Sequence, residues 1–141
     1  MAVERTLIIL KPDCVKKGLV GEVLKRFELA TLKLAGLKMK KLNKKILEEH
    51  YAHHKDKPFF KGLAKFMKSS PVVFVVVEGE NAVAAVRDMA GPTDSKQAPK
   101  GTIRGDYGED IQVNVIHASD SLETANAEIA RFFKKSELFD Y

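Results

Sequence analysis

Two nearly unbroken apolar runs constrain the fold of this chain more than any other feature. The first is Arg5–Lys11 (RTLIILK), and the second is Val72–Val77, which follows Pro71. Apolar runs without alternation are typical of strands that are covered on both faces. We therefore expect a sheet with layers on both sides. Neither run could cross a bilayer as a helix, because a spanning helix needs about 20 apolar residues.

The remaining hydrophobic pattern alternates between helical and extended periods. It predicts helices over 22–34, 47–51, 59–67, 81–89 and 120–133, and further strands over 36–43 and 111–116. Asp120 is expected to cap the last helix in a capping-box-like pattern with Glu123. The order β-α-β-α-α-β-α-β-α predicts an α/β sandwich with a ferredoxin-like βαββαβ core, in which helices cover a four-stranded antiparallel sheet. Residues 1–141 are expected to form one domain.

Charge and cysteine content limit the kinds of partner. The formal net charge of +5 favours anionic partners such as nucleotides, nucleic acid or membrane headgroups. Most of the positive charge is lysine spread along the chain, as on a solvated face, and no nucleic-acid-binding motif accompanies it. The single cysteine, Cys14, excludes an internal disulfide. Because the N-terminus does not resemble a secretory signal either, we expect a cytoplasmic protein.

Residues 91–110 form the first candidate binding segment. They are rich in Gly, Pro, Asp, Ser and Lys, have little periodicity and predict a long loop before the last strand. Thr93 and the run Gly101–Asp106 (GTIRGD) lie here, and glycines let backbone approach a ligand closely. Arg104 can bind a phosphate through two hydrogen bonds, and Arg87 lies on the helix just before the loop. The segment therefore indicates anion binding.

Candidate catalytic residues stand at two strand ends. Lys11 ends the first apolar run, where it either points into a cleft or is an ordinary strand-end lysine. His117 closes the last predicted strand, Ser119 follows it, and Glu128 on the next helix could reach back to orient the imidazole. A nucleophile held by an orienting group is the signature of covalent catalysis. Strict alternation places Asn114 on the opposite face from His117, so a shared site requires the strand to bulge or end early.

Three further histidines raise the question of a metal site. His50, His53 and His54 have the spacing i, i+3 and i+4 on one predicted helix. No carboxylate or cysteine pattern completes a ligand set around them, so no metal site is predicted.

Several motifs in order resemble the nucleoside diphosphate kinase family over essentially the full length of the chain. Each motif alone is short, but together they occur in the family's order and at its spacing. The matching segments are Glu4–Asp13 for the opening strand, Gly18–Glu22 and Lys25–Glu28 for the first helix, Glu49–Tyr51 and Lys57–Phe60 for the nucleotide-holding helices, Pro99–Asp106 for the long loop, and Asn114–Ser121 for the active site.

The resemblance implies transfer of the γ-phosphoryl group from a nucleoside triphosphate, mainly ATP, to a nucleoside diphosphate through a phosphohistidine on His117. It implies that Glu128 and Ser119 orient the His117 ring. Mg²⁺ would arrive with the nucleotide phosphates and have no protein ligand. The remaining implied roles are Lys11, Tyr51 and Arg104 on the transferring group, Arg87 and Thr93 on the outer phosphates, Asn114 and Lys11 on the sugar, and Phe59 and Leu63 on the base.

One residue departs from the family's active-site motif. Ala118 stands where the family usually has glycine, which leaves an alternative: a nucleotide-binding regulatory module of the same fold that has lost turnover. The resemblance also implies a homo-oligomer, with a hexamer favoured and a tetramer left open. It requires neither a membrane nor nucleic acid.

Overall fold

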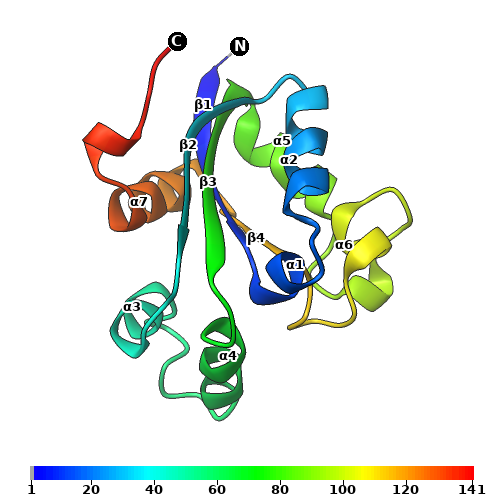
Figure 1. The fold of residues 1–141 in the computed structure, drawn as a ribbon, viewed down its shortest axis with the longest axis vertical. Helices are drawn as coiled ribbons and strands as arrows, with labels where there is room; N and C mark the ends of the chain where they lie inside the picture. Colours follow the sequence, from blue (N-terminus) through cyan, green and yellow to red (C-terminus); the bar gives the residue numbers. More distant parts are fainter. Residues whose placement is uncertain (1) are drawn as a thin grey trace.

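The computed structural model describes residues 2–141 and has a four-stranded antiparallel sheet at its centre. The strand order is β2-β3-β1-β4 (Figure 1). The strands are β1 (Val3–Leu10), β2 (Lys33–Lys40), β3 (Val72–Glu80) and β4 (Ile116–Ala118). The two apolar runs form β1 and β3, which pair along their whole length. The predicted ferredoxin-like arrangement is confirmed.

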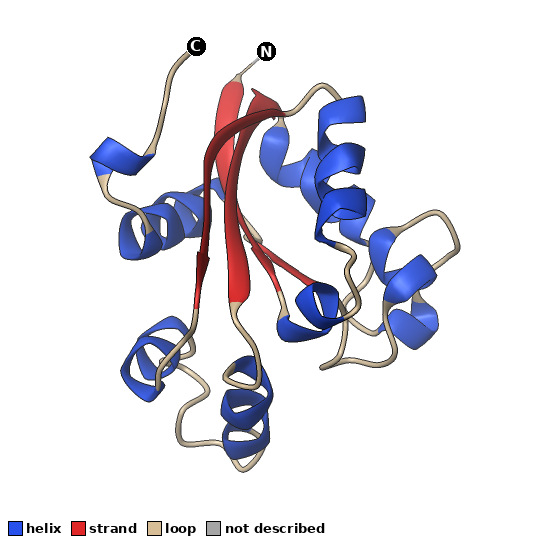
Figure 2. Ribbon diagram, viewed as in Figure 1, coloured by secondary structure: helices blue, strands red, loops and turns tan. Residues whose placement is uncertain are grey.

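Both faces of the sheet are covered, which explains why β1 and β3 do not alternate. Ile8 of β1 faces one apolar core and its neighbour Ile9 faces the other. Figure 2 shows helices flanking the strands on both sides. The first core is covered by α1 (Pro12–Lys16), α2 (Val20–Leu29), α5 (Ala82–Ala90) and α6 (Ile103–Tyr107), and the second by α3 (Lys44–His50), α4 (Phe60–Met67) and α7 (Leu122–Phe132).

The helix predicted over 22–34 ends earlier than expected. α2 stops at Leu29, and Thr31 takes a left-handed backbone conformation with a φ of 62°. A residue in that region ends the helical hydrogen-bond pattern. The chain can then turn back at once, so that β2 begins at Lys33.

The segment predicted as a long loop contains two short helical turns. They are η1 (Ser95–Gln97) and α6. Outside this segment, a further helical turn, η2 (Lys135–Glu137), follows α7. The Thr102 side chain caps α6 by accepting a 3.0 Å hydrogen bond from the Gly105 N–H. Side-chain caps of this kind stabilise a helix that lacks a long apolar face.

The last strand lies further along the chain than predicted. Residues 111–115 are irregular, and β4 consists of Ile116–Ala118. The Asp110 carboxylate accepts hydrogen bonds from the N–H groups of Gln112 (2.8 Å) and Val113 (2.7 Å) and so closes a turn there. Aspartate is favoured in turns because it bonds to backbone two or three residues ahead. His117 therefore lies within the last strand.

The cap of α7 also differs from the prediction. Ser121, not Asp120, is the capping residue, and its Oγ accepts a 3.1 Å hydrogen bond from the Thr124 N–H.

In the part of the chain that is described, no helix is long and apolar enough to cross a membrane.

Candidate active site

A cavity of about 740 Å³ opens at the end of the sheet where β4 begins. Residues far apart in the sequence meet here, from Lys11 after β1 to Glu128 on α7. The predicted site residues that line it are Lys11, Tyr51, Phe59, Leu63, Arg87, Thr93, Arg104, Asn114, His117 and Glu128. Ser119 does not line the cavity and is fully buried behind Glu128.

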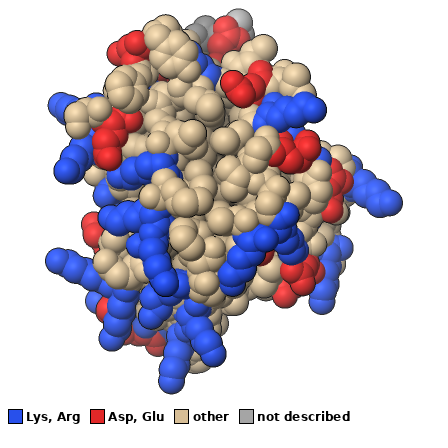
Figure 3. All heavy atoms as spheres, viewed as in Figure 1, with Lys and Arg blue, Asp and Glu red and all other residues tan. Residues whose placement is uncertain are grey.

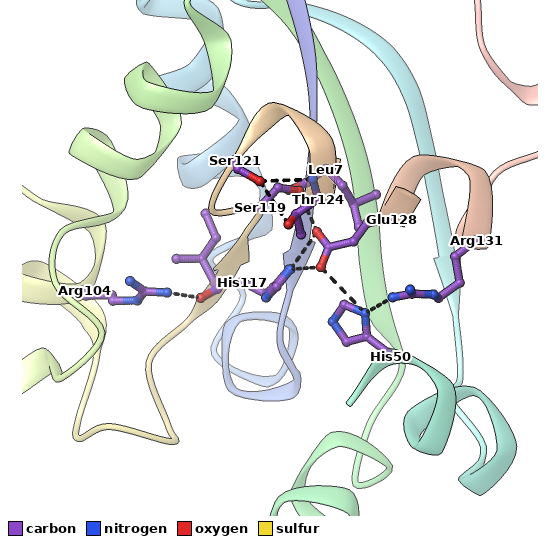
Figure 4. Close-up of polar contacts among 10 residues, drawn as sticks. Leu7, His50, Arg104, His117, Ser119, Ser121, Thr124, Glu128 and Arg131 are labelled. Atoms are coloured by element: carbon purple, nitrogen blue, oxygen red, sulfur yellow. Dashed lines mark hydrogen bonds and ion pairs between the residues drawn. The ribbon is translucent and has the colours of Figure 1, made fainter. Parts of the chain in front are cut away.

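His117 is held by the Glu128 carboxylate. Its Nε2 lies 3.1 Å and 3.0 Å from the two carboxylate oxygens, and Ser119 Oγ donates a 2.6 Å hydrogen bond to Oε1 (Figure 4). Since a carboxylate only accepts, Nε2 carries the ring proton and Nδ1 has the lone pair in the neutral ring. Burial acts to raise the pKa of Glu128, but the hydrogen bonds from His117 and Ser119 outweigh it and keep that pKa below its ordinary value.

A backbone reversal at Val115 brings Asn114 and His117 to the same cavity. Val115 has a φ of 73°, which is rare for a β-branched residue. Its N–H donates to Asp13 Oδ2 at 3.0 Å, and its carbonyl accepts from the Lys11 N–H at 2.9 Å. These two contacts fix the reversal. The early strand end that a shared site requires is therefore present.

Lys11 is almost entirely buried at the floor of the cavity. Its Nζ donates to Asn114 Oδ1 and to the Gln112 carbonyl, both at 2.7 Å. Burial lowers the pKa of its ammonium to about 8, although Asp13 opposes the shift. The lysine thus points inward, as the cleft interpretation required, and carries a charge that an anionic ligand would stabilise.

Arg104 forms part of the cavity wall by binding three backbone carbonyls. Its guanidinium donates to Gly91 and Ile116 at 2.7 Å and to Asn114 at 3.3 Å. Burial lowers the pKa of Arg104 to about 10, and the charge of Arg87 adds to the shift. A guanidinium has five N–H donors, so two remain for a ligand. Phosphate binding by Arg104 is a prediction from the sequence, which gave no sign of these backbone contacts.

His50 is a site residue that sequence reasoning did not assign. It ends α3, so the predicted three-histidine helix is wrong, because His53 and His54 lie in the turns that follow. The His50 ring packs edge-on against His117, with ring centroids 4.9 Å apart. Burial and the nearby His117 lower the pKa of His50 to about 3. The only sign in the sequence that His50 belongs to the site was its position directly before Tyr51, and that position is not specific for a site residue.

Positive side chains gather around the end of the molecule that carries α3 and α4. Figure 3 shows lysines and arginines concentrated at this lower end. The two helices and the turns between them also supply the cavity wall that contains Tyr51, Phe59 and Leu63. An electropositive surface beside a cavity raises the local concentration of anionic ligands.

Comparison with known proteins is decisive for the family. The model of the family described as "Nucleoside diphosphate kinase" matches residues 4–138. The chain belongs to the nucleoside diphosphate kinase family. The nucleoside diphosphate kinase of Pyrococcus furiosus is 54% identical over 142 residues, which cover 99% of this chain and 88% of that protein. That of Gloeobacter violaceus is 54% identical over 138 residues, with 98% and 93% covered.

Solved nucleoside diphosphate kinase structures have the same fold. The Halobacterium salinarum protein in complex with CDP has a TM-score of 0.96 at 45% identity, covering 99% of this chain and 93% of that one. The Aquifex aeolicus nucleoside diphosphate kinase has a TM-score of 0.93 at 45% identity, covering 98% and 100%. The family expected from the motifs is thereby confirmed.

Proposed function

We propose that this chain is an active nucleoside diphosphate kinase that transfers the γ-phosphoryl group of a nucleoside triphosphate, mainly ATP, to a nucleoside diphosphate through a phosphohistidine. The observation that carries the proposal is the pairing of His117 Nε2 with Glu128, which leaves Nδ1 as the nucleophilic nitrogen beside a cavity with Lys11, Arg87 and Arg104. An oriented neutral imidazole facing fixed positive charge suits attack on a phosphoryl group.

The reaction has two half-reactions that are chemically mirror images. His117 Nδ1 attacks the γ-phosphorus, an N–P bond forms, the P–O bond to the β-phosphate breaks, and a nucleoside diphosphate leaves. A second nucleoside diphosphate then takes the phosphoryl group from the ring by the reverse steps. Glu128 stabilises the positive charge that the ring gains in each attack, because it accepts the Nε2–H hydrogen bond.

The surrounding cations and the Tyr51 hydroxyl are proposed to stabilise charge on the transferring group. Lys11, Tyr51 and Arg104 line the cavity in which that charge would develop, and the three carbonyl contacts of Arg104 leave two of its N–H groups for a phosphate. Phosphoryl transfer needs positioning and electrostatic stabilisation more than covalent chemistry from the protein. Burial raises the pKa of Tyr51 to about 12, so its hydroxyl remains a hydrogen-bond donor at neutral pH.

The rest of the nucleotide is proposed to extend along the cavity. Arg87 and the Thr93 side chain would hold the outer phosphates, and Asn114 with Lys11 the sugar. In the structure Asn114 already binds Lys11 Nζ and donates to the Thr93 carbonyl at 2.9 Å, so sugar binding would exchange some of these contacts. Phe59, which is 51% exposed, and Leu63 would pack on the base through contacts open to any base.

Mg²⁺ is proposed to enter as part of the nucleotide substrate. The phosphate end of the cavity presents the basic side chains Lys11, Arg87 and Arg104, whereas magnesium prefers oxygen ligands. In the free protein the Glu128 carboxylate accepts hydrogen bonds from His117 and Ser119. Phosphate oxygens and water are proposed as the ligands of Mg²⁺.

The deciding experiment is a two-step label transfer in the presence of Mg²⁺. The protein is incubated with γ-labelled ATP, freed of nucleotide and then given unlabelled GDP, with His117→Ala in parallel. We expect acid-labile label on the wild-type chain alone and its complete transfer to GTP. Clear ATP binding without label would contradict the proposal and favour the regulatory module instead.

A homo-oligomer in the cytoplasm completes the proposal, with a hexamer favoured over a tetramer. The homo-oligomer is supported by β2, a sheet edge on which Leu37 is 51% and Met39 60% exposed. The cytoplasmic location is supported by the unpaired thiol of Cys14. Exposed apolar side chains on a sheet edge are typical of an interface. Light scattering gives the mass, and a monomer would contradict this part of the proposal.

A further inference from the structure

Two side chains beside His117 have no part in the proposed reaction. They are His50, at the end of α3, and Arg131, on α7. One ligand atom from each of His50, His117 and Glu128 lies within 4.8 Å of the other two. His50 Nδ1 is 3.8 Å from Glu128 Oε2, and His117 Nε2 is 3.0 Å from the same oxygen (Figure 4). Two imidazole nitrogens and a carboxylate thus converge on one point.

Arg131 shows which His50 nitrogen carries the lone pair. Its Nη1 lies 2.9 Å from His50 Nδ1. A guanidinium only donates, so His50 Nδ1 accepts and the ring is neutral. His50 Nδ1 and Glu128 Oε2 are therefore two acceptors 3.8 Å apart, and the hydrogen bond to Nδ1 comes from Arg131. A cation, Arg131, lies against this pair.

We propose that His50 Nδ1, His117 Nε2 and the Glu128 carboxylate form a binding site for Zn²⁺ or a similar divalent transition metal, and that the bound ion blocks phosphorylation of His117. Two imidazoles and one carboxylate, with water as a fourth ligand, make a ligand set that zinc uses in proteins. Imidazole nitrogen favours zinc over Mg²⁺, which demands six oxygen ligands. The ion would take the place of Arg131 on His50.

The three ligand atoms lie within 4.8 Å of one another, so side-chain movements must close the remaining gap to form the site. A tetrahedral zinc bonded at about 2.1 Å separates its ligand atoms by about 3.4 Å. The two distances to Glu128 Oε2, 3.0 Å and 3.8 Å, lie on either side of that value. Arg131 must also be displaced from His50, and its Nε lies 3.7 Å from Glu49, a partner that it can retain.

Blockage follows from the tautomer of His117. The hydrogen bond to Glu128 requires the ring proton on Nε2. The lone pair of Nδ1 is therefore free to attack. A metal on Nε2 requires the lone pair of that nitrogen, and the neutral ring then carries its proton on Nδ1. No bond to phosphorus can form until the ion leaves. This consequence rests on the proposed function, whereas the metal site itself does not.

The binding test uses ZnCl₂ titrated calorimetrically into the full chain without nucleotide and in excess Mg²⁺. We expect one Zn²⁺ per chain, with affinity at least about tenfold weaker in His50→Gln. Arg131→Leu, which removes the competing cation, should bind more tightly. His53→Gln is the matched control, because His53 and His54 form a separate pair with centroids 3.9 Å apart. Zinc binding that is lost in His53→Gln and kept in His50→Gln would overturn the site.

A measurement on the wild-type chain removes dependence on how the variants fold. NMR of the histidine ring nitrogens should show zinc shifting the signals of His50 and His117 while those of His53 and His54 stay in place. Phosphohistidine yield with ATP and Mg²⁺ is then measured at buffered free Zn²⁺. Labelling without zinc tests the proposed function alone. Binding at the site with unchanged labelling would overturn the blockage.

Discussion

Arg104 Nη2 donates a 2.7 Å hydrogen bond to the carbonyl oxygen of Ile116, the residue that precedes His117 in β4. Through this contact and those to Gly91 and Asn114, one buried side chain connects the loop after α5 to the strand that carries the proposed nucleophile. Arg104 is therefore a structural residue of the cavity wall as well as a proposed phosphate ligand.

Arg104→Lys should reduce both stability and nucleotide affinity. A lysine ammonium lacks the planar fork that reaches three carbonyls, and hydrogen bonds to a charged group contribute about 1.5–3 kcal/mol each. We expect the free energy of unfolding in urea to fall by about 2–4 kcal/mol. Arg87→Lys is the control. Affinity for ADP should fall because Arg87 is a proposed phosphate ligand, whereas stability should change by less than about 0.5 kcal/mol because Arg87 is exposed. Equal stability of the two variants would contradict the backbone role.

Glu128→Ala should slow transfer strongly with less effect on nucleotide affinity. The variant removes the acceptor of the His117 Nε2–H hydrogen bond, at 3.0 Å. Loss of a bond to a charged group should lower kcat by roughly 10- to 100-fold. Ser119→Ala, which removes only the 2.6 Å hydrogen bond to Glu128, should have a smaller effect in the same direction. Steady-state kinetics would separate kcat from KM, and a change confined to KM would exclude the orienting role.

Nucleotide affinity should weaken as the pH rises above about 8. The pKa of Lys11 is about 8 in the folded chain, below its ordinary 10.5, chiefly because the ammonium is buried. Below that pH the lysine is already charged, whereas above it the free protein must take up a proton to pair Lys11 with phosphate. The Kd for ADP should therefore rise by up to about tenfold per pH unit there. Fluorescence titrations from pH 7 to 10 would measure it, and Lys11→Gln should have a flatter profile.

Gly105→Ala should destabilise the loop that carries Arg104. A Cβ at Gly105 would lie 2.0 Å from the Pro99 carbonyl oxygen, so the backbone must move. We expect a loss of at least about 2 kcal/mol, together with weaker nucleotide binding. The matched variant is Gly62→Ala in α4, where a Cβ meets nothing within 4 Å. It should stabilise the chain by about 0.5–1 kcal/mol, because alanine favours a helix. Thermal unfolding of the two variants would test whether Gly105→Ala lowers the stability of the chain and Gly62→Ala raises it.

Ala118→Gly should leave the rate of transfer within about twofold of the wild type and lower stability by roughly 1 kcal/mol. Ala118 pairs with Ile8 in the extended backbone of β4, a conformation that any residue adopts. The methyl group is thus compatible with the local backbone, and removing it costs buried surface. A large gain in kcat for the glycine variant would instead show that the methyl group restricts the reaction.

The sequence predicted which residues meet at one cavity wherever a residue type and its spacing were sufficient. Lys11, Arg104, His117 and Glu128 were each identified from their places after strands, in the glycine-bounded loop or on the following helix, and all line one cavity. The two continuous apolar runs likewise indicated a sheet covered on both faces, since each strand supplies both cores.

The prediction of a strand over 111–116 was wrong because a local turn and one distant contact, rather than the alternating pattern, determined the backbone conformation. Ile111, Val113 and Val115 alternate with polar residues, yet Asp110 closes a turn there and Asp13 holds Val115 at positive φ. His50 could not be identified for a similar reason: its partners Glu128 and Arg131 lie on α7, far along the chain. Contacts between distant segments leave no periodic pattern in either one.

The hydrogen bond between Lys11 and Asn114 joins residues 103 positions apart. β1 lies between β3 and β4 in the sheet, so the first strand of the chain acquires its last partner only when residues 116–118 arrive. During synthesis on the ribosome, β1 must therefore wait for nearly the whole chain before its sheet is complete. The cavity is closed by the same late pairing, so partly made chains lack a complete site.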